Sequence, residues 1–218
     1  TFFDAQFETA LKNGFKQAVI FGAGFDSRAQ RFDGINQATR IFELDAPITQ
    51  QEKRKALEDK GIAIPRSLTF VPLNFNQESL AESLARAGYE TGQKTLFLLE
   101  GLTMYLAPEA VDQTFRFLQE TAGPLSRVVF DFVWARVARQ DDHYYGAQDI
   151  LKNINRTGEL WRFFLEEDGL EQFVEKYGFG LADLCDGREL ERRYFSDPQG
   201  RVLARINASH GLAVGLKN

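Results

Sequence analysis

Five short apolar runs alternate with helix-like segments through the first 133 residues, and this alternation limits the chain to an α/β fold. Each run has five to eight residues and is apolar on both faces, as expected of buried parallel strands; the runs are 17–21, 40–45, 68–73, 94–100 and 126–133. Helices are expected between them at 47–60, 77–87 and 108–122. Such repeats predict a doubly wound, mostly parallel sheet between two layers of helices.

The last third of the chain is less regular. A further helix is expected at 166–177, and closing strands are expected at 194–195 and 202–214. No repeat, low-complexity tract or Pro/Gly-rich linker divides the sequence, so we expect a single domain over residues 1–218.

Composition excludes several classes of protein. The chain is 44% hydrophobic and carries a net charge of −5, so a general nucleic-acid binder with a basic face is not expected. No apolar run reaches the roughly 18 residues that a membrane span needs, and no signal peptide opens the chain. With one cysteine and two histidines, no metal site is expected, and a cytoplasmic location is the default.

A glycine turn follows the first apolar run and opens a helix. Gly22, Ala23 and Gly24 would let a ligand approach the backbone closely, although a G-x-G alone also fits a simple tight turn. Asp26 lies inside the turn, where a carboxylate would repel the pyrophosphate of a dinucleotide. S-adenosylmethionine carries a sulfonium and an ammonium group instead, so the acid favours that cofactor.

Polar residues end the next three apolar runs. Glu43 and Asp45 end the second, about 20 residues after the turn, where an acid takes ribose hydroxyls. Asn74 follows the third run, where it could face an adenine, and Glu100 ends the fourth. Ligands bind at this edge of such sheets, although acids at strand ends also cap helices.

Three segments resemble the leucine carboxyl methyltransferase family: Gly-Ala-Gly-Phe-Asp-Ser-Arg at 22–28, Phe-Glu-Leu-Asp-Ala-Pro at 42–47 and Glu-Gly-Leu-Thr-Met-Tyr-Leu at 100–106. The resemblance implies the class I methyltransferase fold, a three-layer α/β/α arrangement with a seven-stranded sheet that ends in an antiparallel hairpin. It also implies S-adenosyl-L-methionine as the cofactor. Residues 1–133 would then form the cofactor-binding half, and 134–218 the substrate side and closing strands.

The resemblance also assigns roles to residues. Gly22–Gly24 would approach the methionine moiety, and Asp45 would bind the ribose. Asn74 and Phe75 would face the adenine, with Asn74 standing where the family usually has Asp. Glu100 would lie against the amino-acid end or the sulfonium.

A lid segment is also implied by the resemblance. The family has an arginine just before a Thr-x-x-Phe-Asp stretch, and that position would precede Thr1. We therefore expect a lid segment upstream of the first residue.

The function expected is methylation of a carboxylate on a small molecule or peptide by in-line displacement. A carboxylate is already ionised at neutral pH and needs no base, whereas a hydroxyl acceptor would need one. His143 is then the candidate base, and Tyr105 lies where substrate would enter. An NAD(P)-dependent oxidoreductase and a non-catalytic cofactor-binding homologue remain alternatives, and the oligomeric state is not indicated.

Overall fold

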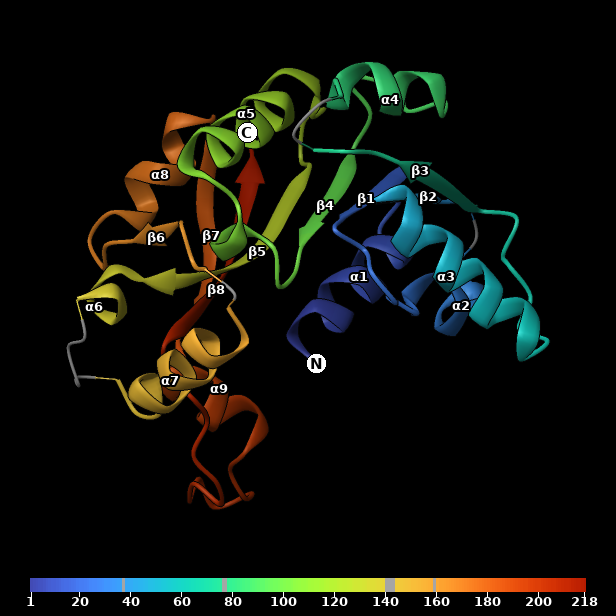
Figure 1. Ribbon diagram of the computed structural model, residues 1–218. Helices are drawn as coiled ribbons and strands as arrows, with labels where there is room; N and C mark the ends of the chain where they lie inside the picture. The colour runs from blue at the N-terminus through green and yellow to red at the C-terminus, as the bar shows by residue number, and fades with distance from the viewer. Residues whose placement is uncertain (37, 76–77, 140–143, 159) are drawn as a thin grey trace.

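The computed structural model describes residues 1–36, 38–75, 78–139, 144–158 and 160–218. In these ranges eight strands form one sheet of order β3-β2-β1-β4-β5-β8-β7, with β6 paired to β5 (Figure 1). The strands are β1 Gln17–Phe21, β2 Arg40–Asp45, β3 Leu68–Pro72, β4 Thr95–Leu99, β5 Arg127–Trp134, β6 Phe164–Leu165, β7 Phe179–Cys185 and β8 His210–Lys217. Among these strands β8 alone runs in the direction opposite to the others. The doubly wound, mostly parallel sheet with antiparallel closing strands is confirmed. In the described ranges it has eight strands and not the expected seven, because the two-residue β6 pairs with β5.

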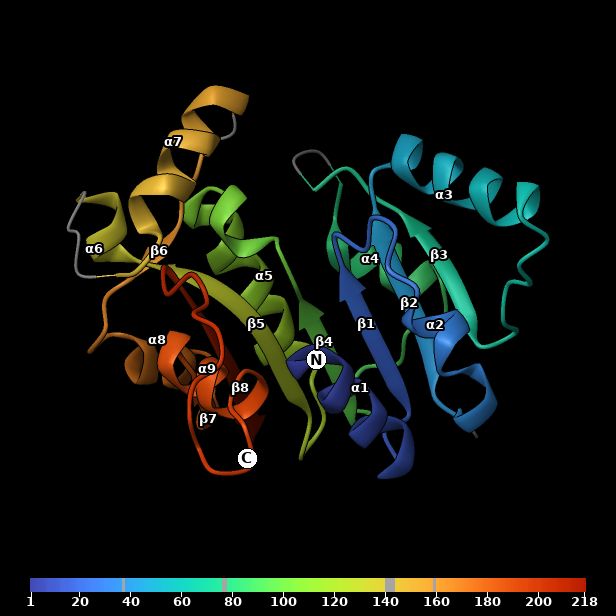
Figure 2. The ribbon, with the colours of Figure 1, turned by 90° about the horizontal axis from the view of Figure 1, so that it is seen from below.

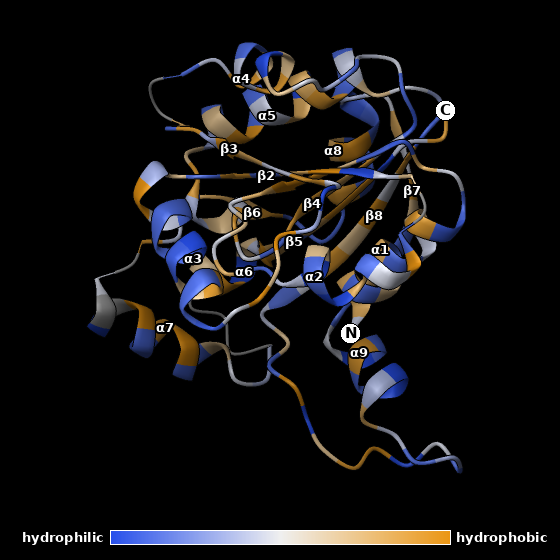
Figure 3. Cartoon of the chain, turned by 90° about the vertical axis from the view of Figure 1, so that its right-hand side faces the viewer, coloured by the Kyte–Doolittle hydropathy of each residue, from blue (hydrophilic) through white to orange (hydrophobic). Residues whose placement is uncertain are grey.

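Helices cover both faces of the sheet. Figure 3 shows α4, α5 and α8 on one side and α1, α2 and α3 on the other, and Figure 2 shows α1 lying across β1 and β4. The helical segments are α1 Phe2–Lys12, α2 Arg28–Arg31, η1 Asp33–Ile35, α3 Pro47–Asp59, α4 Leu80–Arg86, η2 Thr103–Tyr105, α5 Pro108–Thr121, α6 Ala135–Ala138, α7 Ala147–Thr157, α8 Leu170–Lys176 and α9 Gly187–Tyr194. No helix in the described ranges is both long and apolar enough to cross a membrane.

The first half of the chain follows its sequence pattern closely. All five residues of β1 and of β4 are buried, as their unbroken apolar character predicts. Proline occupies the first turn of both α3 and α5, where its missing N–H has no intrahelical partner to lose. The parallel registers of β1 to β4 bring their carboxyl ends to one edge of the sheet.

The predicted closing strands are wrong in part. Tyr194 ends helix α9, Phe195 caps it, and β8 begins only at His210. The strand β7 was not predicted, because it lies at the sheet edge and a bulge between Leu181 and Asp183 breaks its alternation of side chains. The helix expected at 166–177 begins only at Leu170.

Candidate functional site

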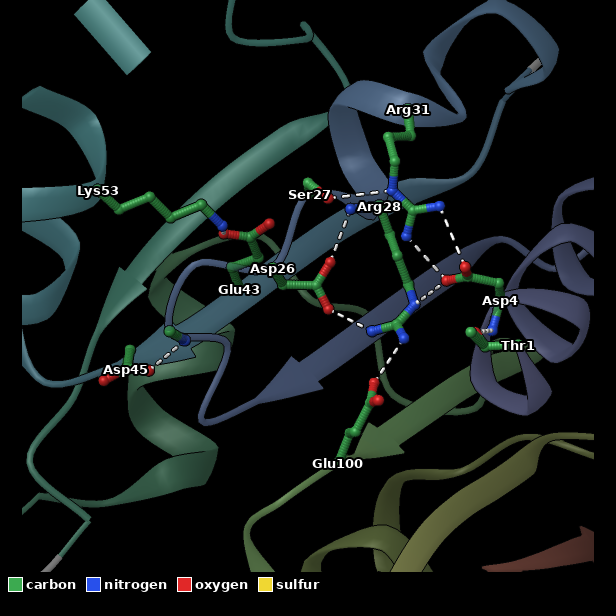
Figure 4. A network of polar contacts seen from close by, with 11 residues as sticks. Thr1, Asp4, Asp26, Ser27, Arg28, Arg31, Glu43, Asp45, Lys53 and Glu100 are labelled. Carbon is green, nitrogen blue, oxygen red and sulfur yellow. Dashed lines mark hydrogen bonds and ion pairs between the residues drawn. The ribbon is translucent and has the colours of Figure 1, made fainter. Parts of the chain in front are cut away.

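The carboxyl ends of three adjacent strands lie at one level of the sheet. Phe21, the last residue of β1, pairs with Leu44 on β2 and with Leu99 on β4. The residues that follow these three, Gly22, Asp45 and Glu100, therefore lie at the same edge. Figure 4 shows Asp45 and Glu100 there. The sequence-based prediction that this edge gathers the turn and the acids agrees with the register.

The glycine turn is fixed by backbone geometry and by Asp45. Gly22 and Gly24 have φ angles of 59° and 48°, which favour glycine, and a Cβ on Gly22 would lie 3.0 Å from a Leu102 methyl. The Gly24 N–H donates to Asp45 Oδ2 at 2.6 Å, and the Ala46 N–H donates to Asp45 Oδ1 at 2.6 Å. Asp45 therefore joins the turn to the end of β2.

Arg28 forms ion pairs with three carboxylates that come from three different segments of the chain (Figure 4). Its guanidinium donates to Asp4 of α1 at 2.9 Å, to Asp26 of the turn at 2.5 Å and to Glu100 after β4 at 2.5 Å. Burial lowers the pKa of Arg28, but the charges of Asp26 and Glu100 outweigh this and raise it above its ordinary value. Arg28 is 6% exposed, so these ion pairs are largely shielded from water.

This network divides the acids into two kinds. Asp26 accepts both the Arg28 backbone N–H, at 2.7 Å, and the guanidinium, and its side chain is only 8% exposed. The Glu100 side chain is 44% exposed, although one of its oxygens accepts from Arg28. Asp26 thus holds the turn together, whereas Glu100 also presents a carboxylate outward.

Two cavities are lined by residues that follow the carboxyl ends of the strands. One of about 300 Å³ is lined by residues that include Gly22, Ala23, Asp26, Arg28 and Glu100. The other, of about 490 Å³, is lined by residues that include Ala46, Asn74, Phe75, Tyr105 and Arg162. Asp45 lines neither cavity, but it accepts from Gly24, whose neighbours Ala23 and Phe25 line the smaller one, and from Ala46, which lines the larger one. The arrangement suits an elongated ligand with one charged end and one flat end.

Glu43 lies apart from both cavities. It is fully buried on β2, and its carboxylate pairs with Lys53 of α3. Burial raises the pKa of Glu43 to about 7, while the charge of Lys53 opposes the shift. The structure therefore places this residue, predicted to bind the cofactor, in a pair that joins α3 to the sheet.

The two candidate catalytic residues have different outcomes. Tyr105 is 41% exposed and lines the larger cavity beside Arg162. His143 lies outside the described residues. No cluster of metal-ligating side chains occurs in the part of the chain that the structure describes.

Asp131 is an acid of this region that the sequence-based prediction missed. Both of its carboxylate oxygens accept from the Gly101 N–H at 2.9 Å, which places it beside the end of β4. Burial raises the pKa of Asp131 to about 7; the Gly101 N–H opposes this shift, and the charge of Glu100 adds to it. The signal in the sequence that could have identified Asp131 is its place as an acidic residue within the apolar run that forms β5.

Asp131→Asn is expected to change the pH dependence of stability. Between pH 4 and 7 the folded protein keeps a proton on Asp131 that the unfolded chain has released, so wild-type stability falls as the pH rises. The free energy of unfolding of the variant minus that of the wild type should therefore be larger at pH 8 than at pH 5 by ~1–3 kcal/mol. Urea unfolding at both pH values measures it, with Asp33→Asn as an exposed control; an advantage equal at both would contradict the prediction.

A family model described as leucine carboxyl methyltransferase matches residues 1–119, a range that contains the glycine turn, Asp45 and Glu100. The chain belongs to the leucine carboxyl methyltransferase family. The family resemblance noted in the three sequence segments is thereby confirmed.

Curated relatives support the same grouping. A relative from Mycobacteroides abscessus with the provisional name S-adenosyl-L-methionine-dependent methyltransferase is 37% identical over 132 residues, covering 61% of this chain and 41% of the relative. The similarly named YktD of Bacillus subtilis is 27% identical over 191 residues, covering 88% and 62%. The chain thus spans between 41% and 62% of the length of these two relatives.

Solved structures share the fold. The magnesium protoporphyrin IX methyltransferase ChlM from Synechocystis PCC 6803, with bound SAH (S-adenosylhomocysteine), has a TM-score of 0.59 at 11% identity. The match covers 99% of this chain and 80% of that one. The class I methyltransferase fold expected from the sequence is confirmed.

Proposed function

We propose that this member of the leucine carboxyl methyltransferase family transfers a methyl group from S-adenosyl-L-methionine to an oxygen acceptor. The observation that carries the donor assignment is the bond from the Gly24 N–H to Asp45 at 2.6 Å. A dinucleotide would need the backbone N–H groups of this turn for its pyrophosphate, and here Asp45 occupies one of them. The names of the relatives support the same donor.

The residues of the two cavities fit the parts of this donor. Asp45 would take the ribose hydroxyls between the cavities, and Asn74 with Phe75 would receive the adenine in the larger one. Glu100 would face the cationic amino-acid end in the smaller one. The smaller cavity does not carry only negative charge, because Arg28 neutralises much of the charge of Asp26.

The chemistry that the bound donor supplies is an electrophilic methyl group on a sulfonium. This chain's own residues orient the donor and exclude water, so that the acceptor oxygen meets the methyl carbon in line with the departing sulfur. A carboxylate of a small molecule or peptide is the first acceptor we propose, because it needs no base at neutral pH. The description of the family supports this acceptor.

A hydroxyl is the second acceptor we propose, and it would need a base. His210, half-buried at the start of β8, is a weak base for this role, because desolvation lowers its pKa to about 4, so the carboxylate stays the acceptor that we favour.

Asp45→Ala is expected to weaken S-adenosylhomocysteine binding by roughly 10- to 100-fold, as the loss of hydrogen bonds to a charged group implies. Isothermal titration calorimetry of the purified protein measures the affinity. Asp33→Ala, an exposed acid on η1, is the matched control and should bind like wild type. An Asp45→Ala variant that folds normally and binds with wild-type affinity would remove Asp45 from the donor site.

A further inference from the structure

A further cavity is lined by residues at the carboxyl ends of β5 and β7. Its volume of about 510 Å³ is within the range of small-molecule sites. Trp134, the last residue of β5, lines it together with Leu184 of β7 and the start of α9. Among the described residues it has no lining residue in common with the two cavities of the proposed donor site. The cavity is therefore a separate candidate site.

Close packing fixes the start of α9 against two other segments that line this cavity. A Cβ on Gly187, the first residue of α9, would lie 2.5 Å from the Cβ of Ala208, so this approach requires glycine. The Ala208 N–H donates to the Tyr145 carbonyl at 3.0 Å. These contacts join three lining segments, so the shape of the cavity is set without a ligand.

The three acids that line the cavity have donors within the protein. Glu167 Oε2 lies 3.1 Å from Arg136 Nε, and Glu191 Oε1 lies 3.6 Å from Arg205 Nε. Asp186 caps α9 and accepts at 2.8 Å from a backbone N–H of its first turn. Two of the three arginines that line the cavity are thus paired with its own acids.

Arg188 is the third arginine and differs from the other two. It is exposed, and in the part of the chain that the structure describes it forms no ion pair. It is the second residue of α9, where the helix dipole disfavours a cation, whereas Arg192 and Arg193 lie in the last turn, where the dipole favours one. The stability of α9 therefore does not explain Arg188, and its guanidinium is available to an anion.

The other walls of the cavity suit a flat apolar group. The Arg205 guanidinium lies over the Tyr145 ring, 4.1 Å from its centroid. Tyr145 and Leu184 are 49% and 36% exposed, so both offer apolar surface to a ligand. An aromatic ring can extend such a stack, because guanidinium and aromatic planes attract each other. A carboxylate is also planar, and it accepts two parallel hydrogen bonds from one arginine.

We propose that this cavity binds an aromatic carboxylate, with the carboxylate on Arg188 and the ring against Tyr145 and Leu184. Binding here is non-covalent and needs no methyl donor, so the proposal stands independently of the proposed function. Both parts of the ligand contribute: the charge pairs with the guanidinium, and the ring covers the exposed apolar walls.

The fluorescence of Trp134 measures this binding. The sequence has two tryptophans, so Trp161→Phe leaves Trp134, which lines the cavity, as the single reporter. We expect benzoate at constant ionic strength to change the emission saturably. The absence of a saturable change at millimolar benzoate would overturn the proposal.

Two analogues test the chemical class of the ligand in the same Trp161→Phe protein. Benzamide has the ring without the charge and should bind at least about tenfold more weakly than benzoate. Cyclohexanecarboxylate has the charge without the flat ring and should bind about threefold more weakly. Benzamide that binds as tightly as benzoate would overturn the ionic contact, and equal binding of the two carboxylates would overturn the aromatic one.

Arg188→Gln in the same background tests the residue that carries the proposal. Benzoate binding should weaken by roughly 10- to 100-fold, as the loss of hydrogen bonds to a charged group implies. Arg192→Gln is the matched control, because Arg192 lies on the same helix but pairs with Glu189 and does not line the cavity. It should bind benzoate within about twofold of the parent protein. Parent-like affinity in Arg188→Gln would overturn the proposal.

Discussion

Arg28→Met is expected to abolish measurable S-adenosylhomocysteine binding, with a loss of at least about 100-fold, and to destabilise the fold by ~3–5 kcal/mol. The guanidinium is the shared partner of Asp4, Asp26 and Glu100, which come from α1, the glycine turn and the end of β4. Without it, the largely buried carboxylates of Asp4 and Asp26 and the partly exposed carboxylate of Glu100 share no cation. The turn and Glu100 would then lose the contact that fixes their relative positions.

Two matched variants separate the role of Arg28 from a general loss of charge. Arg31→Met removes a half-exposed guanidinium that also pairs with Asp4, and it should change binding by less than about threefold. Arg28→Lys keeps the charge but not the fork of donors, and should recover stability more than binding. Calorimetry and urea unfolding give both quantities. Wild-type affinity in a folded Arg28→Met protein would refute the assignment of this network to the donor site.

Lys53→Met is expected to have the second-largest effect, a destabilisation of ~3–5 kcal/mol at pH 8. It leaves the Glu43 carboxylate buried on β2 without its cationic partner. The destabilisation should be smaller at pH 5.5, because burial raises the pKa of Glu43 to about 7. At pH 5.5 the folded protein therefore keeps a proton on Glu43 that the unfolded chain has released. Because Lys53 opposes that shift, its loss raises the pKa of Glu43 further, so the stability of the variant should fall as the pH rises from about 4.5 through 7.

The double variant Lys53→Met/Glu43→Gln provides the control, since it removes both charges of the pair. It should regain most of the stability at pH 8, because neither partner is left ionised in the interior. Lys55→Met, at an exposed position of the same helix, should be near neutral. A double variant as unstable as the single one would show that the unpaired carboxylate is not the cause.

The sequence pattern predicts the fold best where one physical signal dominates. Unbroken apolar runs identify β1 and β4 because both of their faces are covered, and proline identifies the first turns of α3 and α5. The edge strand β7 escapes prediction because only part of it is buried and a bulge interrupts it. Its place in the sheet depends on pairing with β8, a contact that no local pattern records.

For the site, the place of a residue in the sequence predicts where it lies in the fold better than it predicts which side chains it contacts. The strand-end rule brings Asp45 and Glu100 to one edge, and the register agrees. It does not show that Asp26 turns inward to Arg28 or that Glu43 pairs with Lys53. The burial of Arg28 among three acids depends on α1 packing beside the turn. Such convergence of distant elements is a tertiary property.

The central claim, that the carboxyl edge of this sheet receives a donor without phosphate, is tested most directly by titrating one protein sample with S-adenosylhomocysteine and with NAD⁺ in separate calorimetry runs. The account predicts saturable one-to-one binding of S-adenosylhomocysteine and no heat of binding from NAD⁺. Tight binding of NAD⁺ with none of S-adenosylhomocysteine would contradict it.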